Sequence, residues 1–297
     1  MKVSGKQSGL IASNKYLPYV FVMPNMVIFG MFVFWPLIRA FQFSTMEWGL
    51  AGPIRYVGLE NFQTMFEDPV FITALKNTFI YTFGTVPVTM VIALFLAVIL
   101  NRQLFLKTFY RSVIFFPVIT SLVVTGFVWR MLFSTDFGVI NYVFSLVGGP
   151  QIDWLTNTRF ALVAVMIASI WKSLGLSMVI FLAGLQGIPD HLYESAIIDG
   201  ATRRQNFWFI TLPLLKPTTL FVLVISMIRS FRVFEQVYVM TQGGPGYSTQ
   251  VMVMYIFREA FQLFEMGVGS AAAILFFFMV LVLTLLQMKY FGGEVEY

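Results

Sequence analysis

Six stretches of this chain are apolar for long enough to cross a lipid bilayer as helices. A membrane-spanning helix needs roughly 20 mostly apolar residues to cross about 30 Å of hydrocarbon. Prolines inside the first three stretches are tolerable there, because packed neighbouring helices can satisfy the freed backbone groups. No alternation of the β-barrel type is present. We therefore predict an all-α, polytopic membrane protein with a single transmembrane domain over residues 1–297. The predicted spans are 18–41, 77–100, 112–133, 160–186, 217–240 and 268–291.

The composition agrees with a bilayer as solvent and excludes several classes of function. Only 11% of the 297 residues are charged, against about 25% in a soluble domain. The basic residues are scattered along the chain, so we expect no nucleic-acid partner. The chain has no Cys and one His, which excludes disulfides and thiolate sites and predicts no metal site. The first apolar stretch is too long for a signal peptide, and we expect it to stay as a span.

The distribution of Lys and Arg predicts the orientation. With the amino terminus inside, the inner segments carry ten Lys or Arg residues and the outer segments six. Because basic residues are enriched in cytoplasmic loops, we expect both termini in the cytoplasm of a multi-pass protein. The longest inner loop is then 187–216.

This loop has the pattern of two short helices. Pro189 and Asp190 favour a helix start, and Gly200 can end that helix in a left-handed conformation. Thr202 and Gln205 have the spacing of a capping box, so a second helix is predicted from residue 203. The first helix has an apolar face of Leu192, Tyr193, Ala196 and Ile197, and the second has one of Phe207, Ile210 and Leu214. Two amphipathic helices that only order a long loop would give the same pattern.

The loop also resembles the EAA signature of the membrane permease subunits of binding-protein-dependent ABC importers. That signature reads Glu-Ala-Ala, then Gly, then Ile-x-Leu-Pro, and Ser at the second position is the one departure here. The matching residues are Glu194, Ser195, Ala196, Asp199, Gly200, Ile210, Leu212 and Pro213.

The resemblance implies a type I ABC importer permease fold in a bacterial cytoplasmic (inner) membrane. It implies that the first short helix is a coupling helix, held in a groove of a separate ATPase subunit. ATP and Mg would be bound by that ATPase dimer, with no cofactor and no catalytic residue in this chain. Consistently, the sequence has no GxxxxGK[ST] phosphate-binding loop. A second permease subunit and an extracytoplasmic solute-binding protein are the other implied partners.

Two further segments resemble carbohydrate-uptake permeases of the maltose and glycerol-3-phosphate type. They are the "TQGGPGYSTQ" segment at 241–250 and the fourth span with its exit at 169–189. The tail at 289–297 resembles that of the first of the two permeases in such systems. The resemblance implies import of a sugar, oligosaccharide or polyol phosphate by alternating access. Import of an amino acid, peptide or anion is an alternative, as is an ATP-independent carrier or channel. The sequence does not name the solute.

Ionisable groups inside predicted spans point to a solute pathway. Such groups are costly in lipid and normally face a bundle interior or water. We expect Arg229, Arg232, Glu235 and Gln236 to form a polar stripe on one face of the fifth span, with Trp171 and Lys172 nearby. In one interpretation these residues line the pathway, and Trp171 offers a ring on which a sugar stacks. In the other, Arg232 and Glu235 form a structural ion pair, and Lys172 bonds to backbone carbonyls.

The segment 252–266 has apolar residues at helical spacing but is short for a span. We expect it to lie at the outer membrane interface, either as a simple interfacial helix or as a seat for the binding protein.

Overall fold

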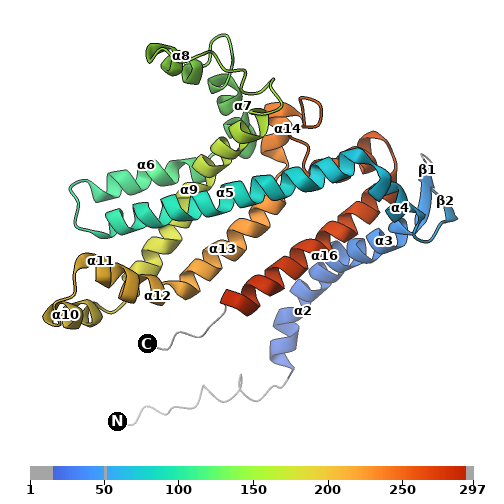
Figure 1. The fold of residues 1–297 in the computed structure, drawn as a ribbon. Helices are drawn as coiled ribbons and strands as arrows, with labels where there is room; N and C mark the ends of the chain where they lie inside the picture. Colours follow the sequence, from blue (N-terminus) through green and yellow to red (C-terminus); the bar gives the residue numbers. More distant parts are fainter. Residues whose placement is uncertain (1–15, 50–51, 292–297) are drawn as a thin grey trace, which may run out of the picture.

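The computed structural model describes residues 16–49 and 52–291, and these residues are predominantly helical (Figure 1). This confirms the all-α membrane fold. The amino-terminal lysines that supported the orientation and the tail after residue 291 lie outside the described residues. Four helices are long and apolar enough to cross a membrane, or up to six if each of two bent helix pairs is one span.

The elements follow one another along the chain as α-helices, three π-helical segments (η) and one antiparallel pair of strands. They are α2 (Leu17–Phe29), η1 (Gly30–Phe34), α3 (Trp35–Ser44), β1 (Met46–Gly49), β2 (Gly52–Tyr56), α4 (Glu60–Glu67), α5 (Pro69–Asn101), α6 (Lys107–Ile119), α7 (Leu122–Leu132), α8 (Val139–Leu146), α9 (Ala161–Gln186), α10 (Asp190–Ile198), α11 (Arg203–Asn206), η2 (Phe207–Thr211), α12 (Leu212–Leu214), α13 (Lys216–Phe231), α14 (Glu235–Thr241), α15 (Met252–Phe257), η3 (Arg258–Gln262) and α16 (Met266–Phe291).

Helices α5 and α9 form the centre of the bundle. The side chain of Asp68 caps α5 by accepting a hydrogen bond from the backbone nitrogen of Val70 at 2.8 Å. Ala93 and Ala97 of α5 are fully buried, and such small residues let membrane helices approach closely. With 33 residues, α5 is about 50 Å long, so it extends beyond the predicted span 77–100 and beyond the hydrocarbon.

The predicted span 112–133 is not one straight helix. It is divided into α6 and α7, which meet at an angle of 102°. Pro117 cannot donate a backbone hydrogen bond, and Thr120 and Ser121 are extended, with ψ of 150° and 142°. Hydropathy depends only on how apolar the residues are. It therefore gives the same prediction for one straight helix and for two helices joined by a bend.

The predicted span 217–240 is also broken. Helix α13 ends at Phe231, three residues are not helical, and α14 starts at Glu235. The preceding segment Arg203–Leu214 meets α13 at 63°. The predicted helical stripe from Arg229 to Gln236 therefore does not exist as one continuous face.

The segment 252–266 packs against the helices of the bundle, and its place at the outer membrane interface stays a prediction. Its helices α15 and η3 pack against α5 and α16, and Met252, Tyr255 and Glu259 are buried. The apolar periodicity that suggested a lipid-facing side reflects contacts with these two helices.

The two ends of the bundle differ in character (Figure 1). Helices α10, α11 and α12 lie at the end where α5 passes into α6, and the β1–β2 pair lies with α4 at the opposite end. Between the ends, the buried apolar residues form three clusters along α5. This arrangement separates the 187–216 loop from the β1–β2 pair by the length of the bundle.

Candidate functional site

A cavity of about 530 Å³ lies between α5, α9 and α13 and is bordered by both helix breaks. The bend between α6 and α7 contributes Val118, Thr120 and Leu122, and the break between α13 and α14 contributes Arg232 and Val233. Irregular backbone at membrane depth is tolerated only inside protein or beside a water-filled cavity. The two breaks and the cavity are therefore parts of one structure.

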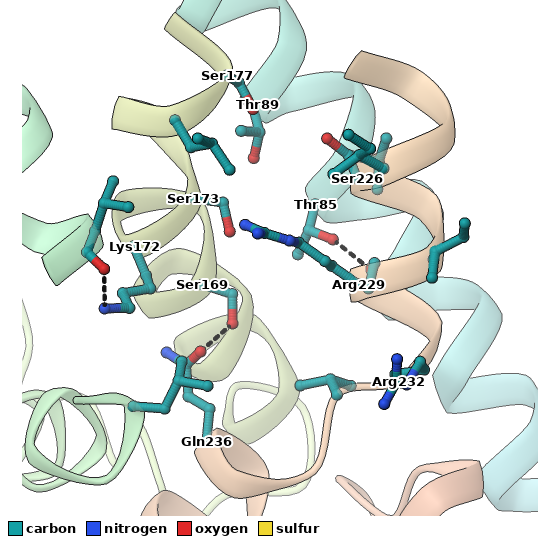
Figure 2. A pocket seen from close by; sticks show the side chains of 18 of the residues that line it. Thr85, Thr89, Ser169, Lys172, Ser173, Ser177, Ser226, Arg229, Arg232 and Gln236 are labelled. Atoms are coloured by element: carbon teal, nitrogen blue, oxygen red, sulfur yellow. Dashed lines mark hydrogen bonds between the residues drawn. The ribbon is translucent and has the colours of Figure 1, made fainter. Parts of the chain in front are cut away.

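Hydroxyl groups line much of this cavity (Figure 2). They come from three helices and include Tyr81, Thr85 and Thr89 of α5, Ser169, Ser173 and Ser177 of α9, and Ser226 and Ser230 of α13. A wall of this kind suits a polyhydroxylated solute, because each hydroxyl can donate or accept a hydrogen bond.

One chain of hydrogen bonds ends at Gln236. The Tyr81 hydroxyl donates to Ser169 Oγ at 2.6 Å, and Ser169 Oγ donates to Gln236 Oε1 at 2.7 Å. Gln236 is 3% exposed, and its Nε2 has no hydrogen-bond partner among the described residues. A buried amide nitrogen normally has a partner, and Gln236 belongs to the cavity wall, so Nε2 is a donor that the described residues leave unpaired.

Lys172 is fully occupied by the bend. Its ammonium donates to the carbonyl oxygens of Pro117, at 2.5 Å, and of Thr120, and it lies 3.3 Å from that of Val118. It is also 3.1 Å from the Thr120 hydroxyl. The Pro117 carbonyl also accepts from the backbone nitrogen and the hydroxyl of Thr120, whereas the Thr120 carbonyl lies beyond the end of α6, where a cation is favourable. Lys172 therefore forms hydrogen bonds to backbone carbonyls, as the second of the two interpretations predicted.

The other charged groups of the cavity wall are Arg229, Arg232 and Glu235. The predicted ion pair between Arg232 and Glu235 is absent from the described residues, because the helix ends between them and they do not share a helical turn. The side chain of Arg229 reaches across the cavity toward Ser173 (Figure 2). Neither arginine has a hydrogen-bond or ion-pair partner within 16–49 and 52–291.

Five of the six residues predicted for the solute pathway therefore lie in the wall of one cavity. Trp171 does not; its ring packs edge-on against Trp129 at 5.7 Å between centroids. The sequence reasoning missed the hydroxyls. Their signal was present, because Ser169, Ser173 and Ser177 recur every four residues and so share one helix face.

The loop 187–216 has the local structure predicted for it. Pro189 precedes α10, Gly200 has a φ of +81°, and Thr202 and Gln205 form a capping box. The hydroxyls of Tyr193 and Thr211 are 2.9 Å apart, and this bond joins α10 to the second helix. The two short helices are therefore held as one unit.

The residues of the predicted coupling set lie on this unit with different exposures. Glu194, Ser195, Asp199, Gly200 and Pro213 are exposed, and Ala196, Ile210 and Leu212 are half-buried.

Large apolar side chains are exposed on the same unit. Ile197 and Ile198 on α10 are 63% and 85% exposed, and Trp208 and Phe209 on η2 are 53% and 77% exposed. Ile197 was predicted on the apolar face of the first helix, and no role was predicted for Ile198, Trp208 and Phe209. Exposed apolar groups rimmed by polar ones are typical of a protein-docking surface.

Neither region has the parts of an active site. Within the described ranges, no three His, Cys, Asp or Glu side chains come together as metal ligands would. The arrangement can bind a polar solute in the cavity and a protein partner at the loop.

Residues 89–292 match the family described as binding-protein-dependent transport system inner membrane component. The arabinooligosaccharides transport system permease protein AraP of Bacillus subtilis (strain 168) is 37% identical to this chain, over 98% of the chain and 94% of that protein. The sn-glycerol-3-phosphate transport system permease protein UgpA of Agrobacterium fabrum is 33% identical, over 97% and 99%. The crystal structure of a bacterial ABC transporter for the acidic polysaccharide alginate contains a chain with a TM-score of 0.84 and 26% identity, over 95% and 96%.

Proposed function

We propose a function from one premise: this chain belongs to the family of binding-protein-dependent transport system inner membrane components. It is therefore a multi-pass permease subunit of an ABC importer and is not itself an enzyme. We propose that its solute is a sugar, an oligosaccharide or a polyol phosphate. The hydroxyl-lined cavity between α5, α9 and α13 is the observation that carries this proposal.

The geometry supports a pathway through this cavity. Its wall carries hydroxyl and charged groups among apolar side chains, so a solute there would exchange bonds with water for bonds with Ser, Thr and Tyr hydroxyls. The two helix breaks at its border let the backbone change direction at membrane depth. The proposal agrees with the names of the relatives, which are permeases for arabinooligosaccharides and for glycerol 3-phosphate.

The loop 187–216 is the proposed site of coupling to a separate ATPase, which would bind ATP and Mg. Ile197 and Ile198 would enter an apolar groove of that subunit, and Glu194 and Asp199 would meet donors at its rim. Because the Tyr193–Thr211 bond fixes α10 to η2, a displacement of α10 would be passed to α13. On this proposal the loop and both termini are cytoplasmic.

The proposed complex contains a second permease subunit, an ATPase dimer and an extracytoplasmic solute-binding protein. In alternating access, closure of the ATPase dimer would move the docked loops and reopen the cavity toward the outside. At the outer end, a second hollow of about 700 Å³ lies between α7 and the 240–245 segment. This hollow is the proposed entrance for solute released by the binding protein.

One experiment tests the proposed function. The chain is reconstituted in lipid nanodiscs with its second permease, its ATPase and its binding protein, and ATP hydrolysis is measured with empty and with solute-loaded binding protein. We expect loaded binding protein to stimulate hydrolysis. If hydrolysis is indifferent to loaded binding protein, the importer proposal is wrong. A screen of sugars against the binding protein then identifies the solute.

A further inference from the structure

The cavity has an excess of free hydrogen-bond donors and positive charge. Its charged lining groups are Lys172, Arg229, Arg232 and Glu235, three cations against one acid. The ammonium of Lys172 donates its hydrogen bonds to carbonyl oxygens at the end of α6. Its positive charge still faces the cavity wall, but it has no N–H group left for a solute. Glu235 lies in the first turn of α14, where the helix dipole favours a negative charge. Glu235 forms no ion pair with Arg229 or Arg232, so neither arginine has an acidic partner among the described residues.

Three side chains of the cavity wall carry N–H donors that have no partner among the described residues. Arg229 and Arg232 have no hydrogen-bond or ion-pair partner among the described residues, and guanidinium groups only donate. The Nε2 of Gln236 is a third free donor, and it is buried. The oxygen of the same amide, Gln236 Oε1, already accepts a hydrogen bond from Ser169 Oγ. The unpaired N–H donors of the cavity wall therefore outnumber its one carboxylate, that of Glu235.

We propose that this cavity recognises the anionic group, a carboxylate or a phosphate, of an acidic saccharide or polyol phosphate. Arg229 presents a planar fork of N–H donors that matches the two oxygens of such a group. Gln236 Nε2 supplies a second donor, and the surrounding hydroxyls bind the rest of the solute. This inference rests on the proposed function for the passage of the solute, but the binding it describes can be tested without transport.

The test measures whether an acidic saccharide shields Arg229 from phenylglyoxal, a reagent that modifies guanidinium groups. The chain is prepared in nanodiscs with its second permease and its ATPase, and modification is followed at each arginine by peptide mass spectrometry. The probes are galacturonic acid trisaccharide and sn-glycerol 3-phosphate. Each is paired with a neutral twin, the fully methyl-esterified trisaccharide and glycerol.

We expect at least one acidic probe to slow modification of Arg229 several-fold and its neutral twin to leave the rate unchanged. The two arms distinguish a carboxylate from a phosphate. Arg159 is exposed outside the cavity and serves as the internal control, so its rate should not change. Three outcomes overturn the proposal: no slowing by either acidic probe, equal slowing by a neutral twin, or equal slowing at Arg159.

A fourth outcome also overturns it. If Arg229 is unreactive in the complex before any probe is added, an acidic group of the second permease occupies it. The variant Gln236→Glu tests the second donor, because it keeps the oxygen that accepts from Ser169 and replaces Nε2 by an acceptor. We expect this variant to need about tenfold more acidic probe for half protection. Unchanged protection would remove Gln236 from the site.

These results are separable from the proposed function. Stimulation of ATP hydrolysis by loaded binding protein, measured on the same nanodiscs, reports import regardless of what shields Arg229. Stimulation without shielding would refute the anion site alone, and shielding without stimulation would refute the importer alone.

Discussion

Lys172 of α9 donates a hydrogen bond to the carbonyl oxygen of Pro117 at 2.5 Å, and this bond fixes α9 to the end of α6. The carbonyl oxygen of Thr120 receives a second bond from the same ammonium. The chain turns by 102° immediately beyond these carbonyls. One charged side chain therefore supplies the donor for the Thr120 carbonyl and adds a donor to the Pro117 carbonyl, which also accepts from the backbone nitrogen of Thr120.

The first prediction concerns the variant Lys172→Met, which keeps the aliphatic stem and removes the ammonium. It leaves the carbonyl of Thr120 without its donor and removes one of several donors from that of Pro117, at a cost of about 1–3 kcal/mol. We expect the thermal unfolding midpoint of the purified protein in nanodiscs to fall by several degrees. Lys76→Met is the matched control, because Lys76 is exposed on α5. Equal midpoints for the two variants would show that the bend does not depend on Lys172.

Hydropathy could not have predicted this bend, although it predicted the helices around it. The broken spans consist of apolar residues on both sides of the break, so a window average reads them as continuous. The break at 232–234 is equally invisible, since Val233 and Phe234 are as apolar as a span interior. The deciding terms are backbone hydrogen bonds and a lysine from another helix, which are tertiary contacts.

The second prediction concerns Gly200, whose φ of +81° ends α10. A Cβ at this position would meet no atom within 4 Å, so the cost of a substitution is backbone strain alone. Gly200→Val should cost about 1–2 kcal/mol at this turn and shift α10. We expect the ATPase to be lost on co-purification while the spans stay inserted.

Gly200→Asn is the control for this turn, because Asn adopts the left-handed conformation more readily than Val. It should retain the ATPase. Normal co-purification of the ATPase with Gly200→Val would contradict the coupling role of the turn.

The third prediction concerns Ile198, which is 85% exposed on α10. If it enters a groove of the ATPase, its burial contributes roughly 1.5–3 kcal/mol to docking. We expect Ile198→Arg to weaken ATPase binding about tenfold or more, measured by titrating the ATPase against the permease complex in nanodiscs. Ile54→Arg, at an exposed position on β2, should leave this affinity unchanged. Equal affinities of the two variants would place the docking surface elsewhere.

The loop was more predictable than the cavity, for a physical reason. Caps and turns are set by residues close in sequence, such as Thr202 and Gln205, so their pattern can be read directly. The cavity combines α5, α9 and α13, and no local pattern specifies which of their faces meet. The spacing of Ser169, Ser173 and Ser177 marks a polar face on α9, but its partner faces come from the tertiary fold.

The fourth prediction concerns Glu259 of η3, outside the membrane-spanning helices. Burial raises the pKa of its carboxyl above the usual value of 4.5, and the charge of Arg258 opposes this change. Because the folded state favours the neutral acid, Glu259 stabilises the protein below its ordinary pKa. This stabilisation is lost as the pH rises through the raised pKa.

Glu259→Gln fixes the neutral form at this position. The difference between the unfolding midpoints, variant minus unaltered protein, should be near zero at about pH 4 and should become positive toward about pH 7. The ion pair with Arg258, 3.5 Å long, is removed as well, but burial acts on the pKa of Glu259 more strongly than the charge of Arg258 does, so this loss is the smaller effect. Glu67→Gln removes a charge from an exposed position on α4 that does not act on the Glu259 carboxyl and serves as the control. If the difference for Glu259→Gln is the same at both pH values, the buried carboxyl is not the source of the pH dependence.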